Sequence, residues 1–142
     1  MLAEGARALE AVQGRDRAKL SATLNDALDA GSAIGEDALS AARASRAAMI
    51  AAATAWLGAF DALAVPSAPG PAPEGLHTTG DPSCCTLASL LGFPAITLPV
   101  GRAPNGLPIS LQLVGLAGGD DELVATARWC ETVLPRWRPP RP

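Results

Sequence analysis

Three side chains capable of nucleophilic or basic chemistry lie close together in this sequence. His77 is the only histidine, and Cys84 and Cys85 follow it by seven and eight residues. A histidine that reaches a cysteine can activate the thiol for covalent hydrolysis of an acyl compound. No local motif orients this imidazole, and Cys85 is expected at the start of a helix. We therefore favour buried, unreactive thiols over a Cys–His enzyme.

Other motifs that carry chemistry are missing or have a simpler explanation. One histidine and an adjacent cysteine pair lack the spacing of a zinc site, so we expect no metal. The sequence has no G-x-S-x-G, no P-loop and no G-x-G-x-x-G, so we expect no nucleotide cofactor. Gly118-Gly119 before the acidic Asp120 is better explained as a plain turn, and Asp81 before Pro82 as part of a turn or a helix cap. Spacing alone identifies no catalytic residue.

Composition excludes several classes of protein. The chain has 142 residues, about one domain, and 49% of them are hydrophobic. Its net charge of −3 argues against nucleic-acid binding, which needs a basic face. Three cysteines without a spaced framework do not suggest a secreted disulfide scaffold. The uncharged run 47–60 is too short to cross a membrane, and the first residues lack a signal-peptide pattern. We expect a soluble, cytoplasmic protein.

The first sixty residues have the pattern of helices. Apolar residues at helical spacing begin at Leu2. Ser21 is placed to cap a second helix, and Gly31 is placed to stop it. A long third helix is predicted over residues 36–60. Its predicted apolar stripe consists of Leu39, Ala42, Met49, Ala53, Trp56, Leu57 and Phe60.

The pattern changes at residue 61. A short apolar strand at 62–65 ends at Pro66, and 66–82 is a long loop rich in proline and glycine. A helix is predicted over 83–91 with Gly92 as its stop, and a closing helix with an acidic start over 120–134. The predicted buried face of the closing helix is Leu123, Val124, Ala127, Cys130, Val133 and Leu134.

A β-hairpin is predicted between residues 95 and 114. The side chains that share a face are Ile96, Leu98 and Val100 on one strand and Ile109, Leu111 and Leu113 on the other, with Ser110 and Gln112 opposite. Asn105-Gly106 is expected to supply the positive φ angles of the reversal, within a connection of six to eight residues. Three strands make a thin sheet with bare edges, so we expect the chain to be part of something larger.

The identity of the residues is more informative than their spacing. The run 78–115 contains T-G-D-P, L-G-F-P-A, L-P-V-G, G-L-P and L-Q-L-V-G in this order. It closely resembles the C-terminal part of amidase signature family enzymes. The segment 61–73, the helix with Arg46 before it and the helix after Gly119-Asp120 also resemble that family. The resemblance covers nearly the whole chain.

The resemblance implies a fold and an activity. The implied fold is α/β, with N-terminal helices followed by a small mixed sheet, a β-hairpin and flanking helices, all part of the family's larger sheet. The implied activity is hydrolysis of a carbon–nitrogen amide bond by a Ser–cis-Ser–Lys triad, without metal or cofactor. The family's G-G-S-S-A/G-G loop has no counterpart here, and Lys19 does not match the family's lysine setting. The triad is therefore expected upstream of Met1, and no catalytic residue is assigned.

The same resemblance places Cys85 and Thr86 in the wall of the acyl pocket, where they are expected to contact a small-molecule amide substrate. Two positions depart from the family, which often has Trp where this chain has Ala88 and Gly where it has Ser110. A wider pocket or looser packing is expected at Ala88.

Two functions fit the sequence. The first is a C-terminal portion of an amidase, inactive alone, and the second is a non-catalytic module that pairs with a partner chain or with itself through a bare sheet edge. The expected organisation is one amidase signature portion over 1–142. Within it, residues 1–60 are helical, 61–134 are α/β, and 135–142 form a tail rich in proline and arginine.

Overall fold

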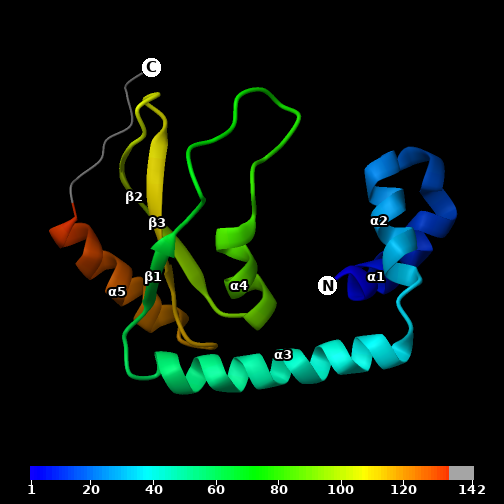
Figure 1. Cartoon of the computed structure of the whole chain (residues 1–142), viewed down its shortest axis with the longest axis horizontal. Helices are drawn as coiled ribbons and strands as arrows, with labels where there is room; N and C mark the ends of the chain where they lie inside the picture. Colours follow the sequence, from blue (N-terminus) through cyan, green and yellow to red (C-terminus); the bar gives the residue numbers. More distant parts are fainter. Residues whose placement is uncertain (135–142) are drawn as a thin grey trace. The chain divides into compact units, whose positions relative to one another are not determined.

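The computed structural model describes residues 1–134, so the tail predicted at 135–142 lies outside the described residues. The chain divides into two compact units, Met1–Ala48 and from Met49 onward. We call them the helical unit and the sheet unit. The boundary between them falls within the long helix α3 (Glu36–Leu57) (Figure 1). None of the helices in residues 1–134 combines the length and apolar character needed to cross a membrane.

The helical unit is built on a close approach of α1 (Leu2–Asp16) and α2 (Ala22–Ser32). The predicted cap is confirmed, because Ser21 Oγ accepts a hydrogen bond from Leu24 N at 3.2 Å. The prediction that Gly31 stops α2 is wrong. Gly31 is buried inside the helix, where a Cβ would lie 2.5 Å from the carbonyl oxygen of Leu2. The glycine is needed for packing between helices and not for termination.

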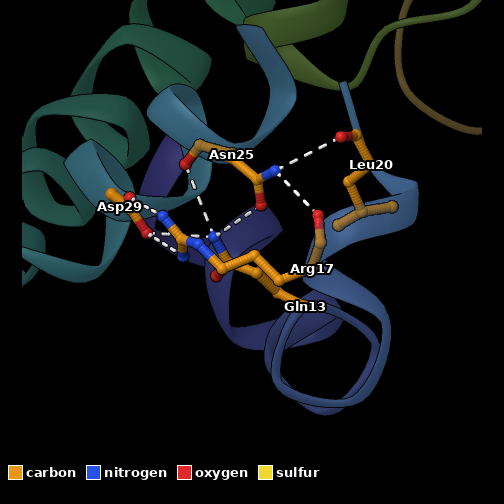
Figure 2. Close-up of polar contacts among 5 residues, drawn as sticks. All are labelled: Gln13, Arg17, Leu20, Asn25 and Asp29. Atoms are coloured by element: carbon orange, nitrogen blue, oxygen red, sulfur yellow. Dashed lines mark hydrogen bonds and ion pairs between the residues drawn. The ribbon is translucent and has the colours of Figure 1, made fainter. Parts of the chain in front are cut away.

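A short 3-10 helix, η1 (Arg17–Lys19), joins the two helices, and polar side chains fix it to α2 (Figure 2). Arg17 donates to both carboxylate oxygens of Asp29, at 2.9 and 2.5 Å. Gln13 Nε2 donates to Asp29 Oδ1 at 2.9 Å, and Asn25 Nδ2 donates to the carbonyl oxygens of Arg17 and Leu20 at 3.1 and 3.4 Å. The hydrogen bond from Arg17 is the main reason that the pKa of Asp29 lies below its usual value.

The sheet unit contains a three-stranded sheet in the order β1–β3–β2. Its strands are β1 (Leu63–Pro66), β2 (Ala95–Arg102) and β3 (Pro108–Val114). The predicted α/β architecture and hairpin are confirmed, but the pairing among described residues is antiparallel only and not mixed. The reason is the strand order. β3 lies between β1 and β2 and runs opposite to both, so the two strands that share a direction do not pair.

The hairpin connection is residues 103–107, shorter than predicted, because β2 continues to Arg102 past an irregularity between Pro99 and Gly101. Gly106 N donates to Ala103 O at 2.8 Å, and Gly106 has a φ of 83°. Asn105 does not have the positive φ that was predicted for it. Its Oδ1 accepts from Leu107 N at 3.2 Å, so its contribution to the turn is a hydrogen bond.

Helices cover both faces of the sheet (Figure 1). On one face, α5 (Asp120–Val133) packs through Leu123 and Ala127 on Leu98 and Leu113. On the other face, α4 (Ser83–Leu91) and the end of α3 pack on β1 and β3. The buried residues of this second cluster are Leu57, Ala88, Leu91, Phe93 and Val114. As predicted, α4 ends at Gly92, which has a φ of 73°.

Covering both faces changes the burial of several residues. Gln112, predicted on a polar face, is only 5% exposed because α4 lies over it. Conversely, Trp56 and Phe60, predicted within the apolar stripe of residues 36–60, are 57% and 58% exposed, and their rings lie 5.5 Å apart. The predicted buried residues Val124 and Val133 of α5 are exposed as well. A sheet of three strands is too narrow to cover the whole apolar surface of its helices.

Candidate functional site

The loop between β1 and α4 is shaped by its own polar groups. Thr78 Oγ1 accepts from Gly80 N at 3.1 Å. Asp81 Oδ1 accepts from Ser83 N at 2.8 Å, which agrees with the expectation of a turn at Asp81, whereas the N-cap of α4 is Pro82 and has no side-chain cap. Together these bonds define the turn that leads into the first residue of α4.

Cys85 and Thr86, the predicted substrate-binding residues, lie in the first turn of α4 and are exposed. Thr86 Oγ1 donates to the carbonyl oxygen of Pro82 at 3.0 Å. The Cys85 thiol donates to the carbonyl oxygen of Ser67 at 3.4 Å, which links the start of α4 to the start of the loop. The expectation of buried thiols is wrong for Cys85, which is exposed at the start of α4, and Cys84 is half-buried. Substrate contact by Cys85 and Thr86 stays a prediction.

A cleft of about 760 Å³ lies between this loop and the sheet. Its walls are largely proline and aliphatic residues, and its polar groups come from Ser67, Thr79, Asp81 and Ser110. Ser67 N and Oγ both donate to the carbonyl oxygen of Ser110, at 3.1 and 3.2 Å. Cys85 and Thr86 are not among the lining residues, and Cys85 reaches the cleft only through its bond to Ser67. An apolar cleft with a few polar groups is the usual form of a small-molecule site.

The side chains of residues 1–134 do not assemble a catalytic centre of their own. No hydrogen bond joins His77 to Cys84 or Cys85 within the described part, and the imidazole lies over Gly75, where a Cβ would be 2.7 Å from His77 Nε2. Within the same residues, no group of three or more His, Cys, Asp or Glu side chains is placed to hold a metal ion. What the site offers is a shaped wall for a ligand.

Comparison with known proteins agrees with this geometry. The family model described as Amidase matches residues 7–124. The chain belongs to the amidase family. A solved structure titled "Crystal structure of amidase" superposes on 94% of this amidase-family chain with a TM-score of 0.82 and 33% sequence identity. The matched part is 33% of that solved chain.

Shorter matches relate this amidase-family chain to curated proteins. It is 43% identical over 47 residues to a mitochondrial glutamyl-tRNA(Gln) amidotransferase subunit from Xenopus laevis. It is 54% identical over 39 residues to a fatty acid amide hydrolase of Oryza sativa subsp. indica. These matches cover 33% and 28% of this chain, and only 9% and 6% of the relatives. The amidase-family chain thus corresponds to a small part of each relative.

The cleft was not predicted from the sequence. Ser67 and Ser110 are far apart in the chain and meet only because β1 pairs with β3. The one signal in the sequence was the length of the proline-rich loop, since long loops inside a domain are often functional.

Proposed function

We propose that this chain is the C-terminal portion of an amidase-family hydrolase that cleaves carbon–nitrogen amide bonds. In this proposal the Ser–cis-Ser–Lys triad lies on residues outside this sequence, and these 142 residues contribute part of the fold and a wall of the substrate pocket. The observation that carries it is the superposition on a third of a solved amidase along almost the whole of this chain.

Within this proposal, Cys85 and Thr86 contact the acyl part of an amide substrate. Support comes from their place in the exposed first turn of α4, which directly follows the proline-rich loop that lines the cleft of about 760 Å³. The bond from Cys85 to Ser67 links this turn to a residue that lines the cleft. We also propose a cytoplasmic location, which imaging of the tagged native protein would test.

The test compares the isolated chain with the native protein. An antibody raised against this chain is used to purify the native protein from its source cells, and its mass and ammonia release from a panel of amides are measured. We expect a mass several times the 14.3 kDa of this chain and ready ammonia release. The isolated 142-residue chain is expected to release no ammonia above a heat-denatured control. Ammonia release by the isolated chain would refute the proposal.

A second function is favoured by the two edge strands and by the exposed Trp56 and Phe60. Here the chain is a non-catalytic module whose bare sheet edge pairs with a separate chain that carries the triad. A native mass equal to that of 142 residues, together with a stoichiometric partner bearing G-G-S-S-A/G-G, would support this second function over the first.

A further inference from the structure

Hydrogen bonds from three separate segments meet around the first turn of α4. Gln112 Nε2, on the central strand β3, donates to the carbonyl oxygen of Cys84 at 3.2 Å. The next residue of α4, Cys85, donates its thiol proton to the carbonyl oxygen of Ser67 at 3.4 Å. Ser67 N and Oγ in turn donate to the carbonyl oxygen of Ser110, at 3.1 and 3.2 Å. Since Ser110 and Gln112 both belong to β3, these bonds form a closed polar circuit that begins and ends on one strand.

Apolar packing fixes only the later part of α4. The buried residues of this helix are Ala88 and Leu91, and both belong to the cluster that packs on β1 and β3. Residues 83–86 are exposed or half-buried. Pro82, which precedes the helix, makes no side-chain cap hydrogen bond. The place of the first turn of α4 on the sheet therefore depends on the polar circuit.

Within the polar circuit, the bond from Gln112 is the strongest constraint on α4. The Gln112 side chain is 5% exposed, and a buried hydrogen bond is both stronger than one in water and costly to leave unmade. A thiol is a weak donor by comparison, and Cys85 is exposed. Gln112 also lies on the strand that pairs with both β1 and β2, so its backbone is held from two sides.

We propose that Gln112 is a positioning residue, whose side-chain amide sets the place of the first turn of α4 and thereby of Cys85 and Thr86. The substrate contacts of Cys85 and Thr86 rest on the proposed function, whereas the positioning of the turn is a property of this chain alone. Loss of the amide should change how a substrate is held and should leave the bond-breaking chemistry, which is proposed to lie outside this sequence, largely as it was.

The first test measures the rate at which iodoacetamide alkylates each cysteine of the 142-residue chain, by mass spectrometry of its peptides. Gln112→Met keeps an unbranched side chain of similar length but removes the amide. Because the bond from the Cys85 thiol to Ser67 must break before the sulfur can attack, a released turn should react faster. We expect an increase of about two- to tenfold at Cys85, the factor that corresponds to one lost hydrogen bond.

Two controls accompany this measurement. Cys130 should react at an unchanged rate in Gln112→Met, because it belongs to α5 on the other face of the sheet. Gln13→Met, at the only other glutamine of the chain and within the helical unit, should change neither rate. Equal rates at Cys85 in Gln112→Met and the wild type would overturn the proposal, as would equal acceleration at Cys85 and Cys130, which indicates general loosening.

A second variant reaches the polar circuit from an exposed position, since Gln112→Met changes a buried one. Cys85→Ala removes the thiol donor at the surface. Hydrogen exchange of the side-chain NH₂ of Gln112, followed by NMR on the ¹⁵N-labelled chain, should become about two- to tenfold faster in this variant. The NH₂ of Gln13 should exchange as before. Unchanged exchange at Gln112 would show that the two bonds do not hold one turn, and would overturn the proposal.

The third measurement uses the native protein that carries this sequence. There Gln112→Met should raise KM for amide substrates about two- to tenfold, with a smaller change in kcat, as expected when substrate binding and not the chemical step is altered. A fall in kcat with KM unchanged would overturn the proposal. A wild-type native protein that releases no ammonia from any amide would refute the proposed function, while the alkylation and exchange rates would still decide whether Gln112 positions the turn.

Discussion

At the scale of single residues, Gly31 is the position on which the packing of α1 against α2 depends. A Cβ there would lie 2.5 Å from the carbonyl oxygen of Leu2 and 2.9 Å from the Cβ of Ala6. The nearest atom belongs to the backbone, which cannot move aside as the end of a flexible side chain can. Any larger residue must therefore push the two helices apart.

Gly31→Ala is expected to destabilise the protein by about 1–3 kcal/mol, the usual cost of overpacking. Gly14→Ala is the matched control, because Gly14 also lies within a helix but has no atom within 4 Å of its would-be Cβ. The control should stabilise the chain by about 0.4–1 kcal/mol through the unfolded state. Urea unfolding followed by circular dichroism measures both. Equal effects of the two substitutions would contradict this account of Gly31.

At the scale of elements, the network around Asp29 holds η1 against α2, as Figure 2 shows. Arg17 and Gln13 both donate to the carboxylate of Asp29. The side chains of Arg17 and Asp29 are about half exposed, so solvent screens the pair and its contribution to stability is small. The role of the Arg17–Asp29 pair is to fix the direction in which the chain leaves α1.

The lowered pKa of Asp29 makes the stability of the helical unit depend on pH. Because the folded pKa lies below the unfolded value near 3.8, the unfolded state binds more protons in the window between the two values. The stabilisation is thus complete above the unfolded pKa and is lost as pH falls through the folded pKa. Urea midpoints at about pH 6, 4 and 2.5 should fall less steeply in Asp29→Asn than in the wild type. If the urea midpoints of the variant and the wild type fell in parallel with pH, the Arg17–Asp29 pair would contribute nothing to the pH dependence of stability.

The sequence predicted the ends of helices correctly where one residue type determines the end. Ser21 caps α2 and Gly92 ends α4, as their types indicate. The roles of residues that depend on contacts with distant elements could not be predicted from the sequence. Gly31 has the type of a helix stop but is held by α1, and Gln112 has the alternation of a solvent-facing residue but is covered by α4. The cleft also depends on pairing between distant segments, so sequence alone predicted the fold class better than the site.

At the scale of the whole molecule, the chain corresponds to only 33% of the solved amidase that it superposes on. Exposed aromatic side chains accompany this partial match, notably the paired rings of Trp56 and Phe60. Exposed apolar patches commonly mark contact surfaces. We therefore expect the isolated chain to associate with itself in a concentration-dependent manner.

The variant Trp56→Ser with Phe60→Ser should weaken this association at least about tenfold, since aromatic residues dominate contact energies. Trp129→Ser is the matched control, because Trp129 is 64% exposed but lies on α5. Sedimentation velocity over a range of concentrations measures the effect. A wild-type chain that stays monomeric throughout would contradict the expectation, as would equal effects of the two variants.

The strand order also sets when the sheet can form during synthesis. β3 is the central strand, yet it is the last of the three to leave the ribosome. Leu63 of β1 and Ala95 of β2 are both register partners of Val114 in β3, so neither can pair there until Val114 has been synthesised. Until then β1 and β2 lack the strand with which both of them pair in this sheet, and unpaired strand edges are available to chaperones or to other polypeptides. The short segment 108–114 must therefore be synthesised before either outer strand can pair within this sheet.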